Sequence, residues 1–243
     1  MISLPKVCSV SLLGAVSLVL GMGASAQADF RLVTTRAALG ATDSIDWGQL
    51  GPESTTPANP FTVPSMGGIS TVVSKALATP FGRQNEGSLW TGNFAPGDRL
   101  LWANNFTSTT NNPITLRFGA TGVFGGGAQI QAEFFGDFVA RVTAFDAGGN
   151  MLATFTEAGH SNRTADNSAI FIGVLSRDPD IQSIVLSLDS ADADTIGDFA
   201  INRFDITIPE PGTLALLAFG VLGLLCYGWR RFGSVSSSFL LSC

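Results

Sequence analysis

Residues 138–145 read Phe-Val-Ala-Arg-Val-Thr-Ala-Phe, and residues 146–156 continue Asp-Ala-Gly-Gly-Asn-Met-Leu-Ala-Thr-Phe-Thr. In the first segment, Phe138, Ala140, Val142 and Ala144 recur at every second position, which places their side chains on one face of a β-strand. The five-residue connection at 146–150 holds two glycines, which adopt the positive φ angles of a tight reversal without a steric penalty. These residues therefore predict an antiparallel hairpin.

Similar short segments lie on both sides of this hairpin. Between them Gly, Asn, Thr, Ser and Pro recur at short intervals, and the helical signal is poor. We expect strands at residues 30–36, 69–75, 99–103, 114–118, 129–135, 138–145, 151–156, 169–175, 181–188 and 199–207. This spacing predicts an all-β fold, an antiparallel β-sandwich of jelly-roll-like type.

Two segments look like interruptions of this pattern. Residues 51–68 contain four prolines and are expected to form a long surface loop. Residues 119–127 are rich in glycine and are expected to form a loop or a bulged edge.

The predicted domain, residues 29–208, is acidic and free of cysteine. It contains ten Lys and Arg residues against eighteen Asp and Glu residues, and such a surface repels phosphate backbones, so we exclude nucleic acid as a partner. Cys8, Cys226 and Cys243 all lie outside it. The domain therefore has no disulfide, no thiol catalysis and no Cys-ligated zinc.

The N-terminus has the order of a secretory signal peptide. Lys6 supplies a positive charge, residues 7–20 are mostly apolar, and small residues follow up to Ala28. We expect a signal helix within residues 1–28, engagement by the secretion machinery and cleavage by signal peptidase after Ala28. Cleavage after Ala26 and a retained signal anchor remain alternatives.

The C-terminus has the order of a membrane anchor. The sequence Pro209-Glu210-Pro211-Gly212 ends the last strand, because proline cannot join a regular hydrogen-bonded ladder. Residues 213–229 carry no charge and span about 26 Å as a helix, close to the thickness of the hydrocarbon core. Arg230 and Arg231 then mark the cytoplasmic side. We expect a single transmembrane helix within 209–232, a short tail at 233–243, and the β-domain beyond the inner membrane.

The tripeptide, the apolar helix and the basic pair together resemble the sorting tail of PEP-CTERM proteins, the exosortase substrates of Gram-negative bacteria. The resemblance implies recognition by an exosortase-type membrane protease, cleavage near Pro209, and transfer to the cell surface or extracellular space, often with exopolysaccharide. Residues 127–131, 144–146, 167–174 and 199–202 also resemble uncharacterised β-sandwich domains that carry this tail. An uncleaved single-pass membrane protein remains the alternative.

Few residues of the domain suggest catalysis. His160 is its single histidine and is expected in a solvated polar loop, so a zinc-protease motif is excluded and a Ser-His-Asp triad is disfavoured. Glycoside hydrolysis needs two carboxylates at a set separation. Glu133 alternates with apolar neighbours and points either into a cleft or to the wet face of a half-exposed strand.

Two weaker patterns concern binding. Asp189, Asp192, Asp194 and Asp198 crowd one inter-strand loop and form a candidate calcium site, although a solvated acidic turn is the commoner explanation. No other cofactor is expected. Trp90 lies in a Gly- and Asn-rich stretch and is the tryptophan expected to be most exposed, which makes it a candidate ligand-binding residue.

The sequence thus favours a non-catalytic structural or binding domain at the cell surface or in the extracellular matrix, with polysaccharide as the expected ligand. A secreted glycan hydrolase or lyase is the alternative. A cleft holding two carboxylates within reach of an exposed tryptophan would favour the enzyme. A filled sandwich with shallow faces would favour the binding module.

Overall fold

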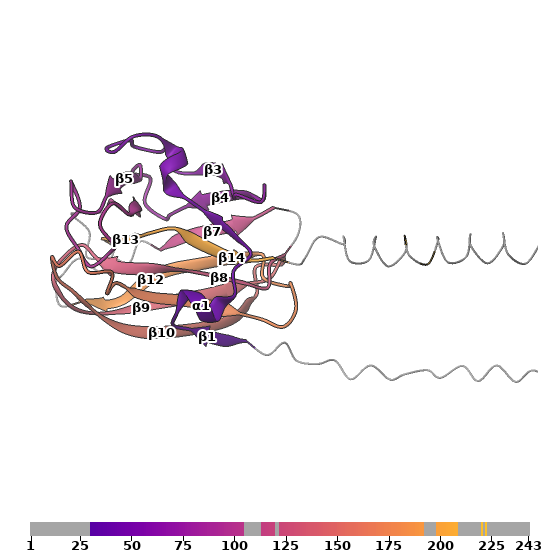
Figure 1. Ribbon diagram of the computed structural model, residues 1–243. Coiled ribbons are helices and arrows are strands. Elements are labelled where there is room, and N and C mark those ends of the chain that lie inside the picture. Colours follow the sequence, from indigo (N-terminus) through magenta and orange to yellow (C-terminus); the bar gives the residue numbers. More distant parts are fainter. Residues whose placement is uncertain are drawn as a thin grey trace, which may run out of the picture.

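The computed structural model describes residues 30–104, 113–119, 122–191 and 198–208, together with Gly220 and Leu222. Within these residues the chain forms two antiparallel β-sheets and two short helical turns (Figure 1). The elements are β1 (Arg31–Val33), α1 (Arg36–Leu39), β2 (Asp43–Ile45), η1 (Trp47–Leu50), β3 (Phe61–Pro64), β4 (Ser70–Ser74), β5 (Gly82–Asn85), β6 (Arg99–Trp102), β7 (Ile114–Phe118), β8 (Gly125–Ala132), β9 (Gly136–Phe145), β10 (Met151–Ser161), β11 (Ile170–Leu175), β12 (Ser183–Ala191), β13 (Phe199–Ile201) and β14 (Phe204–Thr207).

The two sheets pack as the layers of a sandwich. The eight-stranded sheet has the order β1-β11-β8-β13-β6-β5, with β14 paired to β8 and β2 paired to β14. The six-stranded sheet has the order β10-β9-β12-β7-β4-β3. Both sheets contribute to one hydrophobic core, in which the rings of Phe118 and Phe204 lie 6.3 Å apart between centroids. The predicted all-β, antiparallel architecture is confirmed.

The hairpin at residues 138–156 is present as the pair β9 and β10. Phe138, Ala140, Val142 and Ala144 are all buried in the core, which confirms their predicted common face. In the turn, the carboxylate of Asp146 accepts a hydrogen bond from the backbone N–H of Asn150 at 2.8 Å. The pairing extends past the predicted end of the second strand to Ser161.

The predicted loop at 51–68 is wrong in its last part, because residues 61–64 form β3. Phe61 pairs with Val73 of β4, and the side chain of Val63 is 2% exposed. Prolines obscured this strand in the sequence. Pro64 is tolerated because β3 lies at the edge of its sheet, where one side needs no ladder hydrogen bonds.

The predicted loop or bulged edge at 119–127 is also wrong for residues 125–127, which begin the central strand β8. A Cβ atom on Gly127 would lie 2.7 Å from the Cα atom of Gly173 in β11. Glycine is therefore required here by the close approach of two backbones, a tertiary constraint that resembles a loop signal in the sequence.

The single strand expected at 199–207 is divided at Asn202 and Arg203 into β13 and β14. Both strands pair with β8, β13 at its C-terminal half and β14 at its N-terminal half. The break places the side chain of Asn202 against Gln129 on the outer face of the eight-stranded sheet.

Two local covers protect parts of that outer face. Residues 86–98, here called the 86–98 loop, place Trp90 and Phe94 on Leu100 and Trp102. At another part of the face, α1 packs through Leu39 against Phe171 and Val33. Polar side chains lie on the sheet between these covers.

The predicted signal helix lies outside the described residues, and so does the predicted transmembrane helix apart from Gly220 and Leu222. Among the helices that the structure does describe, none has the length and apolarity needed to cross a bilayer.

Candidate functional site

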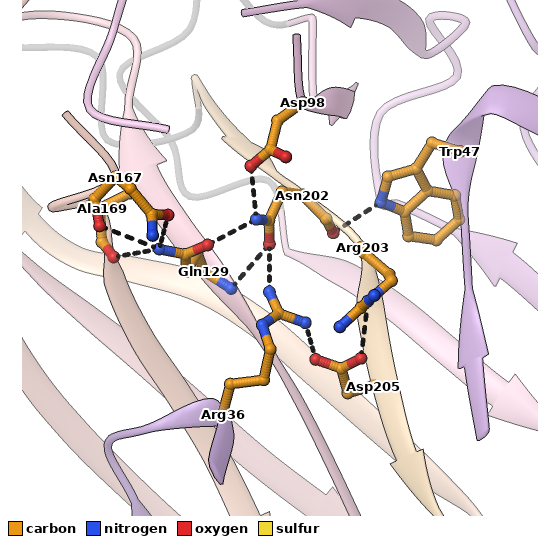
Figure 2. Close-up of polar contacts among 9 residues, drawn as sticks. All are labelled: Arg36, Trp47, Asp98, Gln129, Asn167, Ala169, Asn202, Arg203 and Asp205. Carbon is orange, nitrogen blue, oxygen red and sulfur yellow. Dashed lines mark hydrogen bonds and ion pairs between the residues drawn. The ribbon is translucent and has the colours of Figure 1, made fainter. Parts of the chain in front are cut away.

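An open groove of about 350 Å³ lies on the outer face of the eight-stranded sheet, between α1 and the end of the 86–98 loop. We call it the polar groove. Its polar walls include Arg36, Asp98, Arg99, Gln129, Asn202 and Arg203. Figure 2 shows five of these side chains, which converge from α1, the loop, β8 and the junction of β13 with β14: Arg36, Asp98, Gln129, Asn202 and Arg203.

Asn202 is the centre of the groove's hydrogen bonds. Its Nδ2 donates to Gln129 Oε1 at 2.6 Å and to Asp98 Oδ2 at 2.9 Å. Its Oδ1 accepts from Arg36 Nη2 and from the backbone N–H of Gln129, both at 3.1 Å. Because Asn202 is only 4% exposed, its amide holds the side chains of Arg36, Asp98 and Gln129 in position, and those side chains face the groove.

Arginine 36 belongs to an ion-pair network beneath the groove. Arg36 and Arg203 both pair with the carboxylate of Asp205, which is 2% exposed, and the Arg203 contact measures 2.9 Å (Figure 2). Burial, together with the nearby charge of Arg203, lowers the pKa of Arg36 to about 10. Arg36 also lies 5.4 Å above the ring of Phe171. Two pairing cations thus offset the cost of the buried carboxylate.

Gln129 connects this network to the chain that precedes β11. Its Nε2 donates to Asn167 Oδ1 at 3.0 Å and to the carbonyl oxygen of Ala169 at 2.9 Å. Asn167 is exposed and adopts a φ of 63°, a left-handed conformation that asparagine tolerates. The amide of Gln129, the carboxylate of Asp98 and the guanidinium groups of the three arginines therefore all line the polar groove. Such groups suit a ligand rich in hydroxyls, which both donates and accepts hydrogen bonds.

A second, smaller pocket of about 160 Å³ lies on the same sheet under the 86–98 loop. Gln84, Leu89, Trp90, Trp102 and Glu133 line it, and we call it the tryptophan pocket. Burial, together with the nearby charge of Asp198, raises the pKa of Glu133 to about 7.

The structure places Trp90 differently from the sequence-based expectation. Its side chain is 4% exposed, so the expectation that it is the most exposed tryptophan is wrong. It packs against Phe94 and Trp102, yet it also lines the tryptophan pocket. The Gly- and Asn-rich surroundings form a loop that folds back over the sheet.

The acidic residues of the candidate calcium site are only partly described. Asp189 pairs with Arg141 on the six-stranded sheet, and Asp198 is buried and accepts from Trp102 Nε1 at 2.5 Å. Asp192 and Asp194 lie outside the described residues. Within the described ranges, no three His, Cys, Asp or Glu side chains gather in a way that would hold a metal ion.

His160 lies on β10, which corrects its predicted place in a loop. It is exposed, as expected, and its Nδ1 lies 2.6 Å from Asp137 Oδ1. The sorting residues Pro209, Glu210, Pro211, Gly212, Arg230 and Arg231 lie outside the described residues.

Sequence reasoning missed the groove residues Arg36, Gln129, Asn202 and Asp205. One signal was present, since alternation in residues 199–207 fails where Asn202 and Arg203 follow each other. The partners of that asparagine lie 73, 104 and 166 positions away, so local patterns do not reveal them.

The comparison with protein families identifies the end of the chain. The PEP-CTERM protein-sorting motif matches residues 207–231. The end of the chain is thus a PEP-CTERM sorting motif. This motif implies export through the inner membrane, processing by an exosortase and display at the cell surface. It covers the tail alone, and a comparison with curated proteins gives no match.

Solved structures with a similar arrangement of strands include three bacterial proteins. A DUF4465 family protein from Bacteroides caccae is 14% identical, with a TM-score of 0.38, over 74% of this chain and 100% of that one. CsCBM6-3 from Clostridium stercorarium, in complex with cellobiose, is 13% identical, with a TM-score of 0.25, over 68% and 93%. A glycoside hydrolase family 43 arabinoxylan arabinofuranohydrolase from Bacillus subtilis, in complex with cellotetraose, is 11% identical, with a TM-score of 0.29, over 68% and 43%.

Proposed function

We propose that this chain is an exported, non-catalytic binding protein of the cell surface or extracellular matrix, with exopolysaccharide as its ligand. In this proposal a signal helix within residues 1–28 directs export of a jelly-roll-like β-sandwich. A transmembrane helix within 209–232 then presents the tail to the exosortase. The observation that carries the proposal is the PEP-CTERM motif at residues 207–231.

The polar groove supports the binding part of the proposal. Asp98, Gln129 and Arg203 place a carboxylate, an amide and a guanidinium group along one open hollow. A polysaccharide presents hydroxyls that match such groups, and an open groove admits a chain that continues past the site at both ends. The acidic balance of the domain agrees with a neutral or cationic glycan.

The sorting part is tested by mass spectrometry of the mature protein isolated from its native host. A C-terminus near Pro209 is expected from exosortase processing. Recovery of intact peptides from residues 232–243 in the mature protein would contradict processing and leave an uncleaved membrane anchor.

A glycan-active enzyme is the second candidate, and Glu133 is the observation that favours it. A carboxylic acid with a pKa near 7 suits general acid catalysis, and Asp198 is a second carboxylate close by. Asp198 is 1% exposed and bound to Trp102, which leaves it a poor nucleophile or base for a substrate. Release of reducing ends from the host polysaccharide by the wild type, but not by Glu133→Gln, would establish the enzyme.

A further inference from the structure

Three buried polar atoms of the tryptophan pocket have no hydrogen-bond partner among the described residues: two are acceptors, and the third, Trp90 Nε1, is a donor. Gln84 Oε1 and Glu133 Oε2 are both buried, and neither has a hydrogen-bond partner among the described residues. Both side chains line the pocket. A buried acceptor without a donor is costly, so these two atoms favour a ligand that brings N–H or O–H groups.

Aromatic rings form the other walls of the pocket. The rings of Trp90 and Trp102 lie 6.4 Å apart between centroids, at an interplanar angle of 65°. Trp102 already donates its indole N–H to Asp198, so it offers a ligand its ring instead. Indole rings attract cations, most strongly where water is excluded, and they also pack against sugar rings.

The charged groups around the pocket are negative. Glu133 belongs to the pocket, and Asp198 at the start of β13 is the charge that acts on it. The other lining residues, on β5, β6 and the 86–98 loop, are uncharged. Lys75 is a cation that interacts electrostatically with Asp198. Its Nζ, however, donates to Thr79 Oγ1 and to two backbone carbonyl oxygens, and Lys75 does not line the pocket. The potential in the pocket therefore favours a ligand cation.

The volume limits the size of that ligand. A cavity of about 150 Å³ holds one benzene ring, and this pocket has about 160 Å³. Leu89 lines it and is 64% exposed, so the mouth opens to solvent. One six-membered ring fits, and a longer chain can extend outside.

We propose that the tryptophan pocket binds one amino-sugar residue of a polysaccharide, with the ammonium group donating to Glu133 Oε2 and Gln84 Oε1. The sugar ring then packs against Trp90 and Trp102. This inference rests on the proposed function for the identity of the ligand, and it assigns a cationic glycan to a site separate from the polar groove.

The proton on Glu133 sets the pH dependence of this interaction. With a pKa of about 7, the carboxyl group is mostly neutral at pH 6 and mostly ionised at pH 8. A ligand that stays cationic over this range, such as methylammonium, should bind about tenfold more tightly at pH 8 than at pH 6.

The test uses the full-length protein in detergent micelles, titrated calorimetrically at pH 7 with glucosamine, glucose and N-acetylglucosamine. Glucosamine should bind at least tenfold more tightly than glucose or N-acetylglucosamine. Glu133→Gln should remove this preference, and Gln84→Leu should reduce it. Glu157→Gln, on β10 of the other sheet, is the matched control and should keep the preference.

The outcomes separate this inference from the proposed function. Equal binding of glucosamine and glucose, or an unchanged preference in both folded pocket variants, would overturn the inference. Methylammonium binding as tightly as glucosamine would overturn the contribution of the sugar ring. Thermal unfolding of each variant shows whether it folds, and Gln84→Leu keeps the test decisive if Glu133→Gln does not. Processing in the native host and co-sedimentation with exopolysaccharide are measured independently, and they decide the proposed function whatever the outcome at the tryptophan pocket.

Discussion

The indole N–H of Trp47 donates to the backbone carbonyl oxygen of Asn202 at 2.8 Å, across 155 positions of sequence. Trp47 is fully buried, and the bond holds the point where β13 ends and β14 begins. The break in the strand is therefore built into the core, and it presents the Asn202 side chain to the polar groove on the opposite side of the backbone (Figure 2).

Removing the Asn202 amide should destabilise the domain. Asn202→Ala removes two hydrogen bonds from Gln129 and one each from Asp98 and Arg36. We expect the free energy of unfolding to fall by about 2–4 kcal/mol, as measured by urea denaturation. Gln49→Ala removes one exposed amide hydrogen bond to Pro64 and should cost less than about 1 kcal/mol. A similar small loss in both variants would contradict the central role of Asn202.

Adding a methyl group at Gly127 should be equally damaging. The new Cβ would meet backbone atoms of Ile172 and Gly173 at 2.7 Å, and backbone in the middle of a sheet cannot move aside. We expect Gly127→Ala to cost about 2–3 kcal/mol in urea denaturation. Gly119→Ala, whose Cβ would make one contact at 3.3 Å to Ser70, serves as the control. Wild-type stability in Gly127→Ala would show that β8 and β11 separate more easily than the structure indicates.

Glu133 should make the stability of the domain depend on pH. Because burial raises its pKa from 4.5 to about 7, the folded state holds the proton more tightly than the unfolded chain. The protonated Glu133 therefore contributes to the free energy of unfolding, and this contribution is fully present below pH 4.5 and is lost as the pH rises through 7. As the pH rises from 5 to 8, the free energy of unfolding of Glu133→Gln should therefore increase by about 2 kcal/mol relative to that of the wild type, after allowance for partial exposure.

Urea denaturation at both pH values checks this change. Gln49→Ala removes an exposed amide that does not line the pocket and is not titratable, so its stability relative to the wild type should not vary with pH. A difference between Glu133→Gln and the wild type that is the same at pH 5 and pH 8 would be inconsistent with the raised pKa.

The sorting tail should depend on its tripeptide. Replacement of Pro209, Glu210 and Pro211 by alanine removes the residues on which recognition is proposed to depend. We expect the variant to stay in the inner-membrane fraction with its C-terminal peptides intact, as detected by fractionation and mass spectrometry. Glu157→Gln should be processed like the wild type. Release of the alanine variant at the wild-type level would show that recognition of the tail does not require the tripeptide.

The polar groove should contribute to polysaccharide binding. Asn167→Gly keeps the left-handed backbone, because glycine adopts a φ of 63° freely, but it removes the contact with Gln129. Combined with Arg99→Gln, it should weaken co-sedimentation with host exopolysaccharide about tenfold or more. Arg141→Gln, on the six-stranded sheet, is the charge-matched control. Equal loss in both variants would indicate a general charge effect.

The hairpin and the outline of the fold could be predicted because their causes are local. Alternation in residues 138–145 and glycines in the following turn act over a few positions, and the structure contains both strands. β2 and β5 were missed since Asp43–Ile45 and Gly82–Asn85 hold little apolar pattern. These short strands form because neighbouring strands supply their hydrogen bonds, which is a tertiary effect.

The all-β class, the hairpin and the sorting motif follow from local sequence, because strand alternation, turn glycines and a Pro-Glu-Pro tail each involve only a few neighbouring residues. The positions of the polar groove and the tryptophan pocket depend instead on how distant strands pack. Arg36 reaches Asn202 over 166 positions, and the tryptophan pocket joins Gln84 on β5 to Glu133 just after β8. Both sites form only when distant strands pair and pack together. The same packing buries Glu133 and so raises its pKa.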